Sequence, residues 1–118
     1  MSATEYRPWG YFQILGNDLT VQPQYQVKKL LIKPGQKFSL QHHEHRKEYW
    51  LITTGHGVVT IDTMEYMASP GKTFIIPQGM KHRAANGGLE NLVIIETQMG
   101  DDIREDDIVR YEDIYGRK

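Results

Sequence analysis

The stretch GQKFSLQHHEHRKEYWLITTG, residues 35–55, carries metal-ligand side chains between two glycines. Gln41 and His43 are separated by one residue, and Glu48 follows after four more. Residues at i and i+2 of a strand point to the same face, so Gln41 and His43 would lie side by side. The gap before Glu48 leaves room for a tight return of the chain. The stretch therefore predicts two adjoining segments that bring these side chains together.

A second glycine-bounded stretch adds another ligand type far along the chain. Pro77 follows Gly71 after five residues, Gly79 after one more, His82 after two more and Asn86 after three more. His82 can meet the first set only if the sheet curls. Imidazole, carboxylate and amide oxygen together suit zinc, manganese, cobalt, nickel or ferrous iron. Because the chain has no cysteine, a structural zinc site built from thiolates is excluded.

Other histidines compete for these roles. His45 is the rival ligand, because it is also separated from His43 by one residue. Glu48 would then lie only three positions after the second histidine, which does not fit the expected register. His42 points to the opposite face from His43 and is expected to pack or face outward. His56 lies between two glycines in a turn, where solvation is the simplest expectation.

Composition bounds the class of protein. The chain has 118 residues, and residues 1–118 are expected to form a single domain. A net charge of −1 gives no indication of nucleic acid or an anionic membrane as partner. The lack of cysteine fits a reducing cytosol. Residues 1–10 contain no apolar run and do not resemble a signal peptide. We therefore expect a cytoplasmic protein.

Strand signals dominate the rest of the chain. Short runs rich in β-formers end at glycine, proline or asparagine turns at spacings of roughly ten residues, which predicts an all-β sandwich or barrel closed as a jelly roll. The expected strands are Tyr11–Leu15, Tyr25–Lys33, Phe38–His43, Glu48–Thr54, Gly57–Asp62, Thr73–Ile76, Lys81–Ala85 and Leu92–Gln98. The acidic tail Asp101–Lys118 is expected to cap the domain as a solvated segment or a short helix beginning near Asp101 or Glu105.

The two glycine-bounded stretches resemble the signature motifs of the cupin superfamily, with Gln41 in place of the usual first histidine. Further blocks resemble the C-terminal isomerase domain of the bifunctional mannose-1-phosphate guanylyltransferase/mannose-6-phosphate isomerase family (type II). These blocks are Arg7–Gly10, Pro34–Trp50, Ile76–Arg83, Ile95–Gly100 and Glu105–Arg117. The likeness covers nearly the whole chain and leaves out the guanylyltransferase half, so nucleotidyl transfer is not expected.

The resemblance implies a cupin jelly roll that interconverts mannose 6-phosphate and fructose 6-phosphate. It also implies one divalent ion, with zinc favoured and manganese, cobalt, nickel or iron as alternatives. The related classical mannose-6-phosphate isomerases hold zinc through Gln, His, Glu and His, which Gln41, His43, Glu48 and His82 would match.

Isomerisation needs a base, and Glu96 is the first candidate. A carboxylate within the apolar strand Leu92–Gln98 is costly unless it is used or paired. A salt bridge across the sheet is the plain alternative. Lys29, which interrupts another apolar strand, is the second candidate, although a lysine base needs a lowered pKa.

A sugar phosphate also needs cations, and arginine forms bidentate contacts with phosphate oxygens. The candidates in the matching blocks are Arg46, Lys81, Arg83, Arg110 and Arg117. A homodimer is expected, because the Arg7–Gly10 arm and the strand Tyr11–Leu15 could reach a neighbour and cover an edge. The alternatives to an isomerase are a non-enzymatic, metal-containing sugar-binding cupin and a metal-dependent oxygenase.

Overall fold

The computed structural model describes residues 3–117, and within them the chain forms strands and no helix. One antiparallel sheet has six strands in the order β1-β2-β3-β10-β5-β8. Its strands are β1 (Ala3–Arg7), β2 (Gly10–Asp18), β3 (Gln24–Ile32), β10 (Leu92–Gly100), β5 (Arg46–Thr54) and β8 (Thr73–Ile76).

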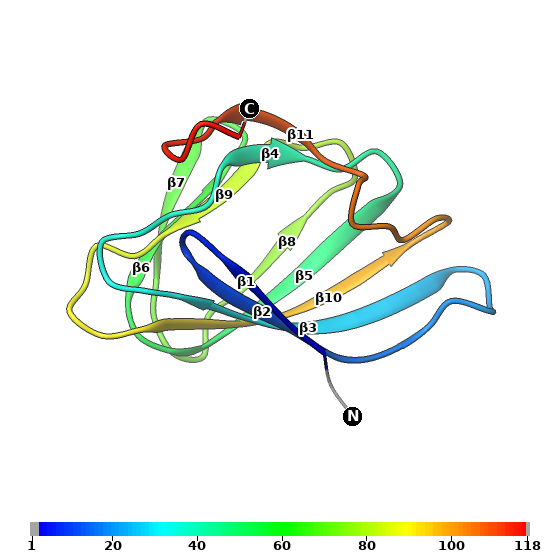
Figure 1. Ribbon diagram of the computed structural model, residues 1–118, viewed down its shortest axis with the longest axis horizontal. Helices are drawn as coiled ribbons and strands as arrows, with labels where there is room; N and C mark the ends of the chain where they lie inside the picture. Colours follow the sequence, from blue (N-terminus) through cyan, green and yellow to red (C-terminus); the bar gives the residue numbers. More distant parts are fainter. Residues whose placement is uncertain (1–2, 118) are drawn as a thin grey trace.

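The second antiparallel sheet has five strands in the order β11-β4-β9-β6-β7. They are β11 (Val109–Glu112), β4 (Leu40–His42), β9 (His82–Ala85), β6 (Gly57–Ile61) and β7 (Met64–Ala68). Figure 1 shows the two sheets curling around a shared interior, with β11 and β4 along the top of the view and the β1–β2 hairpin in front. This is the expected jelly-roll barrel.

The barrel interior is apolar at one end and polar at the other. Along β10 the inward residues change from Leu92 and Ile94 to Glu96 and Gln98, all of them buried. The neighbouring strands change in the same place, because Glu96 pairs with Lys28 on β3 and with Trp50 on β5. The apolar half holds the domain together, and the polar half is where functional side chains gather.

Each expected strand overlaps an observed one, and Thr73–Ile76 is reproduced to the residue. The sequence did not predict β1, β7 or β11. The tail differs most from expectation: instead of a short helix, it forms β11, which pairs with β4. The reason is that β4 would otherwise be the outer strand of its sheet with unpaired backbone groups.

The Arg7–Gly10 arm folds onto its own barrel as the turn between β1 and β2. Trp9 is buried in the core, where its ring packs edge-on against Phe38 with 5.6 Å between the ring centres.

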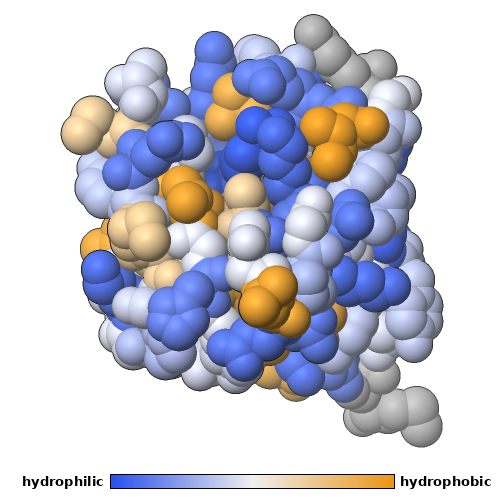
Figure 2. Space-filling model, turned by 90° about the vertical axis from the view of Figure 1, so that its left-hand side faces the viewer, coloured by the Kyte–Doolittle hydropathy of each residue, from blue (hydrophilic) through white to orange (hydrophobic). Residues whose placement is uncertain are grey.

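On the face viewed in Figure 2, the apolar residues lie in separate patches among polar ones. None of the described residues belongs to a helix long and apolar enough to cross a membrane.

Two of the motif glycines test how the turns are built. Gly55 and Gly71 have φ angles of 85° and 91°, but only Gly55 has close neighbours, since a Cβ there would stand 2.3 Å from the Asn91 carbonyl oxygen. Gly71→Ala should therefore lower the free energy of unfolding by about 1–2 kcal/mol, the cost of positive φ alone. Gly55→Ala should cost about 1–3 kcal/mol more, because the backbone must shift. Equal losses in urea unfolding would contradict this account.

Candidate metal centre and active site

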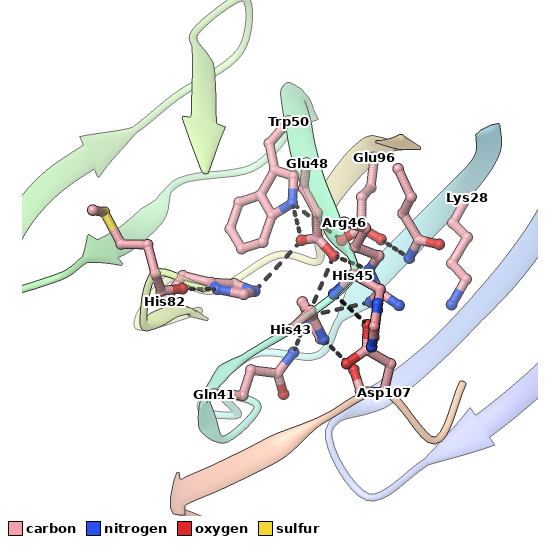
Figure 3. A network of polar contacts seen from close by, with 12 residues as sticks. Lys28, Gln41, His43, His45, Arg46, Glu48, Trp50, His82, Glu96 and Asp107 are labelled. Carbon is pink, nitrogen blue, oxygen red and sulfur yellow. Dashed lines mark hydrogen bonds and ion pairs between the residues drawn. The ribbon is translucent and has the colours of Figure 1, made fainter. Parts of the chain in front are cut away.

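Three buried side chains converge at the polar end of the barrel. His43 follows β4, Glu48 lies on β5 and His82 opens β9. His43 Nε2 lies 3.3 Å from Glu48 Oε2, and His82 Nε2 lies 3.4 Å from Glu48 Oε1 (Figure 3). One ligand atom from each residue lies within 4.8 Å of the others. The two glycine-bounded stretches of the sequence thus meet in space as the curled sheet requires.

Backbone carbonyl groups fix which nitrogen of each imidazole faces the centre of the triad His43, Glu48 and His82. His43 Nδ1 lies 2.7 Å from the Asp107 carbonyl oxygen, and His82 Nδ1 lies 2.9 Å from that of Met80. A carbonyl can only accept, so each Nδ1 donates its proton, and in the neutral form of each imidazole the lone pair is on Nε2. His82 Nε2 is buried and has no hydrogen-bond partner among the described residues. His43 Nε2 lies 3.2 Å from a guanidinium nitrogen of Arg46. Imidazoles that are oriented through Nδ1 and direct Nε2 at a shared carboxylate are the arrangement found at divalent metal sites.

Glu48 stays ionised despite complete burial. Burial alone would raise its pKa, but His43, His82 and Arg46 outweigh that effect and hold the pKa well below its usual range. Arg46 Nε donates to Glu48 Oε2 at 2.9 Å, and the Trp50 indole donates to Oε1 at 3.0 Å. Burial lowers the pKa of His43 to about 4, which favours a neutral imidazole. Burial opposes protonation of His82 as well, but the contact with the Glu48 carboxylate and its charge outweigh burial and raise the pKa of His82. Two imidazoles and a carboxylate are the ligand types that fit a borderline divalent ion, which would displace the proton from His82 on binding.

Gln41 lies at the edge of this triad and is in register with His82 on the next strand. Its Nε2 atom is 3.4 Å from His43 Nε2, and its Oε1 atom accepts a hydrogen bond from the Ser39 hydroxyl at 2.8 Å. A half-turn of the amide would bring the oxygen to the triad, and Ser39 could then accept instead of donate. Gln41 as fourth ligand stays a prediction.

The rival histidines lie outside the group. His45 is 42% exposed and its Nδ1 is 3.1 Å from Asp101 Oδ1. His42 points away from His43, and its Nδ1 lies 2.7 Å from the hydroxyl of Tyr111. The register argument thus separated His43 from both neighbours.

Glu96 lies in the wall of the adjoining cavity, close to the triad. Its Oε2 atom accepts a hydrogen bond at 3.1 Å from the Trp50 indole, which also binds Glu48. Gln98 Nε2 donates to Glu96 Oε1 at 2.6 Å, and Gln26 Nε2 donates to Gln98 Oε1 at 3.1 Å. Burial, followed by the charge of Glu48, raises the pKa of Glu96 to about 7. A carboxyl with such a pKa can exchange protons near neutral pH.

The second base candidate does not reach this cavity. Lys29 lies on the outer face of β3, with its amine 5.7 Å from the centre of the Tyr11 ring. Its neighbour Lys28 points inward, is 4% exposed and pairs with Glu105. Because side chains alternate along a strand, only one of two adjacent lysines can face the interior. Lys28 is therefore the lysine of the site.

The cations proposed for phosphate fall into two groups. Arg46, Arg110 and Arg117 line the cavity, together with Arg7 and Lys28. Arg83 instead donates to the Phe38 carbonyl at 3.1 Å, and Lys81 lies 4.2 Å from the centre of the Tyr111 ring. The cavity has a volume of about 600 Å³ including its open mouth.

Asp107 is the residue that sequence reasoning missed. Its carboxylate accepts hydrogen bonds from the backbone N–H groups of Glu44 and His45, both at 2.9 Å, while its carbonyl orients His43. The acidic tail thus holds the loop that carries a candidate ligand. The aspartates clustered between 101 and 107 gave no means of singling out this one.

Comparison with known proteins gives a family for this arrangement. The family model described as "Mannose-6-phosphate isomerase C-terminal" matches residues 1–113. The alginate biosynthesis protein AlgA of Pseudomonas aeruginosa is 41% identical over 112 residues, which cover 95% of this chain and 22% of that protein. A mannose-1-phosphate guanylyltransferase of Escherichia coli is 41% identical over 113 residues, covering 95% and 23%. The chain thus spans less than a quarter of the length of these relatives.

Solved structures agree on the fold. The capsular polysaccharide assembling protein CapF from Staphylococcus aureus matches with a TM-score of 0.77 at 20% identity, over 95% of this chain and 33% of that one. An RmlC-like cupin from Shewanella frigidimarina matches with a TM-score of 0.73 at 20% identity, over 90% and 88%. At such identities the likeness establishes the cupin fold alone.

The metal site can be tested with a matched pair of histidines. His43→Ala should remove most of the bound divalent metal, because it deletes an oriented ligand, while the apolar half of the barrel keeps the domain folded. His45→Ala, two residues away and outside the triad, should keep its metal. Elemental analysis of both purified variants, with circular dichroism to check folding, measures this. Full metal content in folded His43→Ala would contradict the assignment.

Proposed function

The chain belongs to the mannose-6-phosphate isomerase C-terminal family, and from this premise we propose that it is a metal-dependent aldose–ketose isomerase acting on mannose 6-phosphate and fructose 6-phosphate. One observation carries the proposal. Glu96, a buried carboxyl with a pKa raised to about 7, lines a cavity that also exposes His43 of the triad. Proton abstraction next to a carbonyl needs a base near neutral pKa beside a group that stabilises negative charge.

In this proposal Glu96 takes the proton from C2 of the open-chain aldose. The electron pair of the C–H bond forms the C1–C2 double bond, and negative charge develops on the oxygen of C1. Glu96 then returns the proton to C1, the hydroxyl proton of O2 passes to the oxygen of C1, and C2 becomes the carbonyl carbon of the ketose. Lys28 and Arg46 supply positive charge on the same cavity wall, where it stabilises the developing enediolate.

The hydrogen bonds of Glu96 suit this role. Trp50 and Gln98 each donate to one of its oxygens, so the carboxylate form is oriented as well as stabilised. A divalent ion held by His43, Glu48 and His82, with Gln41 as fourth ligand, would act as a Lewis acid toward the carbonyl and hydroxyl oxygens of the substrate.

The role of Glu96 can be tested by a nearly isosteric change. Glu96→Gln keeps the size of the side chain but removes the base, so the rate of conversion of mannose 6-phosphate should fall about 10²-fold or more with metal content unchanged. Glu65→Gln, on the outward-facing strand β7, should leave the rate unchanged. A coupled assay for fructose 6-phosphate measures both. If Glu96→Gln converts mannose 6-phosphate at the wild-type rate, another group must be the base.

The pH dependence follows from the same group. A base works only as the carboxylate, so kcat/KM should decline toward acid pH as Glu96 takes up a proton. Metal content must be measured at each pH, because the histidine ligands also bind protons as the pH falls. A flat profile in protein that retains its metal would contradict Glu96 as the essential base.

Two histidines and one carboxylate are also the ligand set of non-haem iron oxygenases, which keeps an oxygenase as the second candidate. Oxygen uptake by the iron-loaded protein with a sugar substrate would favour that candidate. Metal-replete protein that binds sugar phosphate but neither isomerises nor oxidises it would be a binding module. Zinc as the resident ion, a homodimer and a cytoplasmic location stay predictions.

A further inference from the structure

Three arginines meet at the mouth of the cavity from the two ends of the chain. Arg7 ends β1, Arg110 lies on β11 and Arg117 follows the last turn. Strand β1 is one outer strand of the six-stranded sheet, and β11 is one outer strand of the five-stranded sheet. The termini therefore bring guanidinium groups together from both sides of the barrel opening.

Arg110 differs from the others because its charge has no ion-pair partner among the described residues. Arg117 forms a two-pronged ion pair with Asp113 at 2.7 and 3.2 Å, and Arg7 lies 3.4 Å from the exposed Glu5. Arg110 has no ion pair or hydrogen bond to its side chain within residues 3–117, and its Nε atom is buried. A buried donor without an acceptor is unfavourable unless a ligand supplies one.

The charges around Arg110 add to this cost. Burial lowers its pKa, and the neighbouring Arg117 and Arg7 lower it further, while Asp113 acts in the opposite direction. The carboxylates that line the cavity do not relieve Arg110, because Glu105 pairs with Lys28 and Glu96 accepts from Trp50. The mouth of the cavity therefore carries excess positive charge.

The sheet fixes how far this charge lies from the triad. Arg110 is the register partner of Gln41, and Gln41 is the register partner of His82. Directly paired residues on adjacent strands share a face, so these side chains form a row across β11, β4 and β9. Two inter-strand spacings separate Arg110 from His82, about 10 Å between their backbones. A six-carbon chain can bridge the space left between their side chains.

We propose that Arg110, flanked by Arg7 and Arg117, binds the phosphate dianion of the substrate at the cavity mouth and so sets the orientation of the sugar chain toward the triad. This inference rests on the proposed function for the identity of the substrate, but not for the anion site itself. Guanidinium groups bind phosphate oxygens through paired, charge-assisted hydrogen bonds. A free sugar would leave Arg110 without its acceptor, so the site selects phosphorylated sugars over unphosphorylated ones.

The test uses inorganic phosphate as the probe and metal-free protein, so that phosphate cannot bind an ion. Isothermal titration should detect phosphate binding to the wild type, and Arg110→Gln should weaken it about 10- to 100-fold, the loss expected for a charged hydrogen-bonding group. Arg83→Gln removes an arginine that lies elsewhere in the same sheet, and it should bind phosphate as the wild type does. Removal of an unpaired charge should leave the melting temperature of Arg110→Gln unchanged or higher.

Activity gives an independent readout. With mannose 6-phosphate, Arg110→Gln should raise KM by a similar factor while metal content is unchanged. If Arg110→Gln loses phosphate binding, the anion site is supported. If the protein also isomerises no hexose phosphate, that second result counts against the proposed function and not against the anion site. Three results would overturn the anion site, whether or not the protein is an isomerase. They are no phosphate binding by the wild type, binding by Arg110→Gln as tight as that of the wild type, and a loss of affinity in Arg83→Gln as large as that in Arg110→Gln. Arg7→Gln is a second variant, and it should weaken phosphate binding less than Arg110→Gln does, because the Arg7 side chain is partly exposed.

Discussion

The site depends on one indole N–H that two buried carboxyl groups share. Trp50 donates to both Glu48 and Glu96, yet the pKa values of the two carboxyls are shifted in opposite directions from their usual range. Glu48 has Arg46 and two imidazoles beside it and stays ionised, so it can act as a ligand. Glu96 is equally buried, has weaker compensation and faces the negative charge of Glu48, so it can hold a proton near neutral pH. When environments separate the pKa values of neighbouring acids, their chemical roles separate as well.

The barrel makes this separation possible by placing polar residues at the same level of three adjoining strands. The inward positions of β3, β10 and β5 all turn from apolar to polar toward one end, so Gln26, Gln98 and Glu48 lie side by side across the sheet. A charge on only one strand would be surrounded by aliphatic groups and would lose its ionised form. The tail completes the arrangement from outside, since Asp107 fixes both the loop after β4 and the tautomer of His43.

Motif spacing was sufficient to predict that His43, Glu48 and His82 lie close together, because their convergence depends on period-two register and on turns that the sequence marks with glycine and proline. The same reasoning misplaced the lysine of β3. Apolar residues stand on both faces of that strand, so alternation cannot tell whether Lys28 or Lys29 faces inward. Strand β11 was missed for another reason: its residues Val109–Glu112 lie in an acidic tail and become a strand only because β4 offers an unpaired edge. Such pairings follow from tertiary structure and leave no local signal.

Charge varies along the cavity in a way that gives a bound molecule one preferred direction. Near the triad each buried carboxyl is matched, Glu48 by Arg46 and the oxygens of Glu96 by Trp50 and Gln98. Across the whole cavity five cationic residues face two acidic ones, and Glu105 already pairs with Lys28. The excess positive charge therefore lies with Arg7, Arg110 and Arg117 at the mouth. An anion is attracted more strongly to the mouth than to the inner end, where Arg46 is already paired with Glu48 and Lys28 with Glu105. A substrate with an anionic group at one end and hydroxyl or carbonyl oxygens at the other is therefore oriented before any contact with the triad forms, which is the condition for a single base to act on a single carbon.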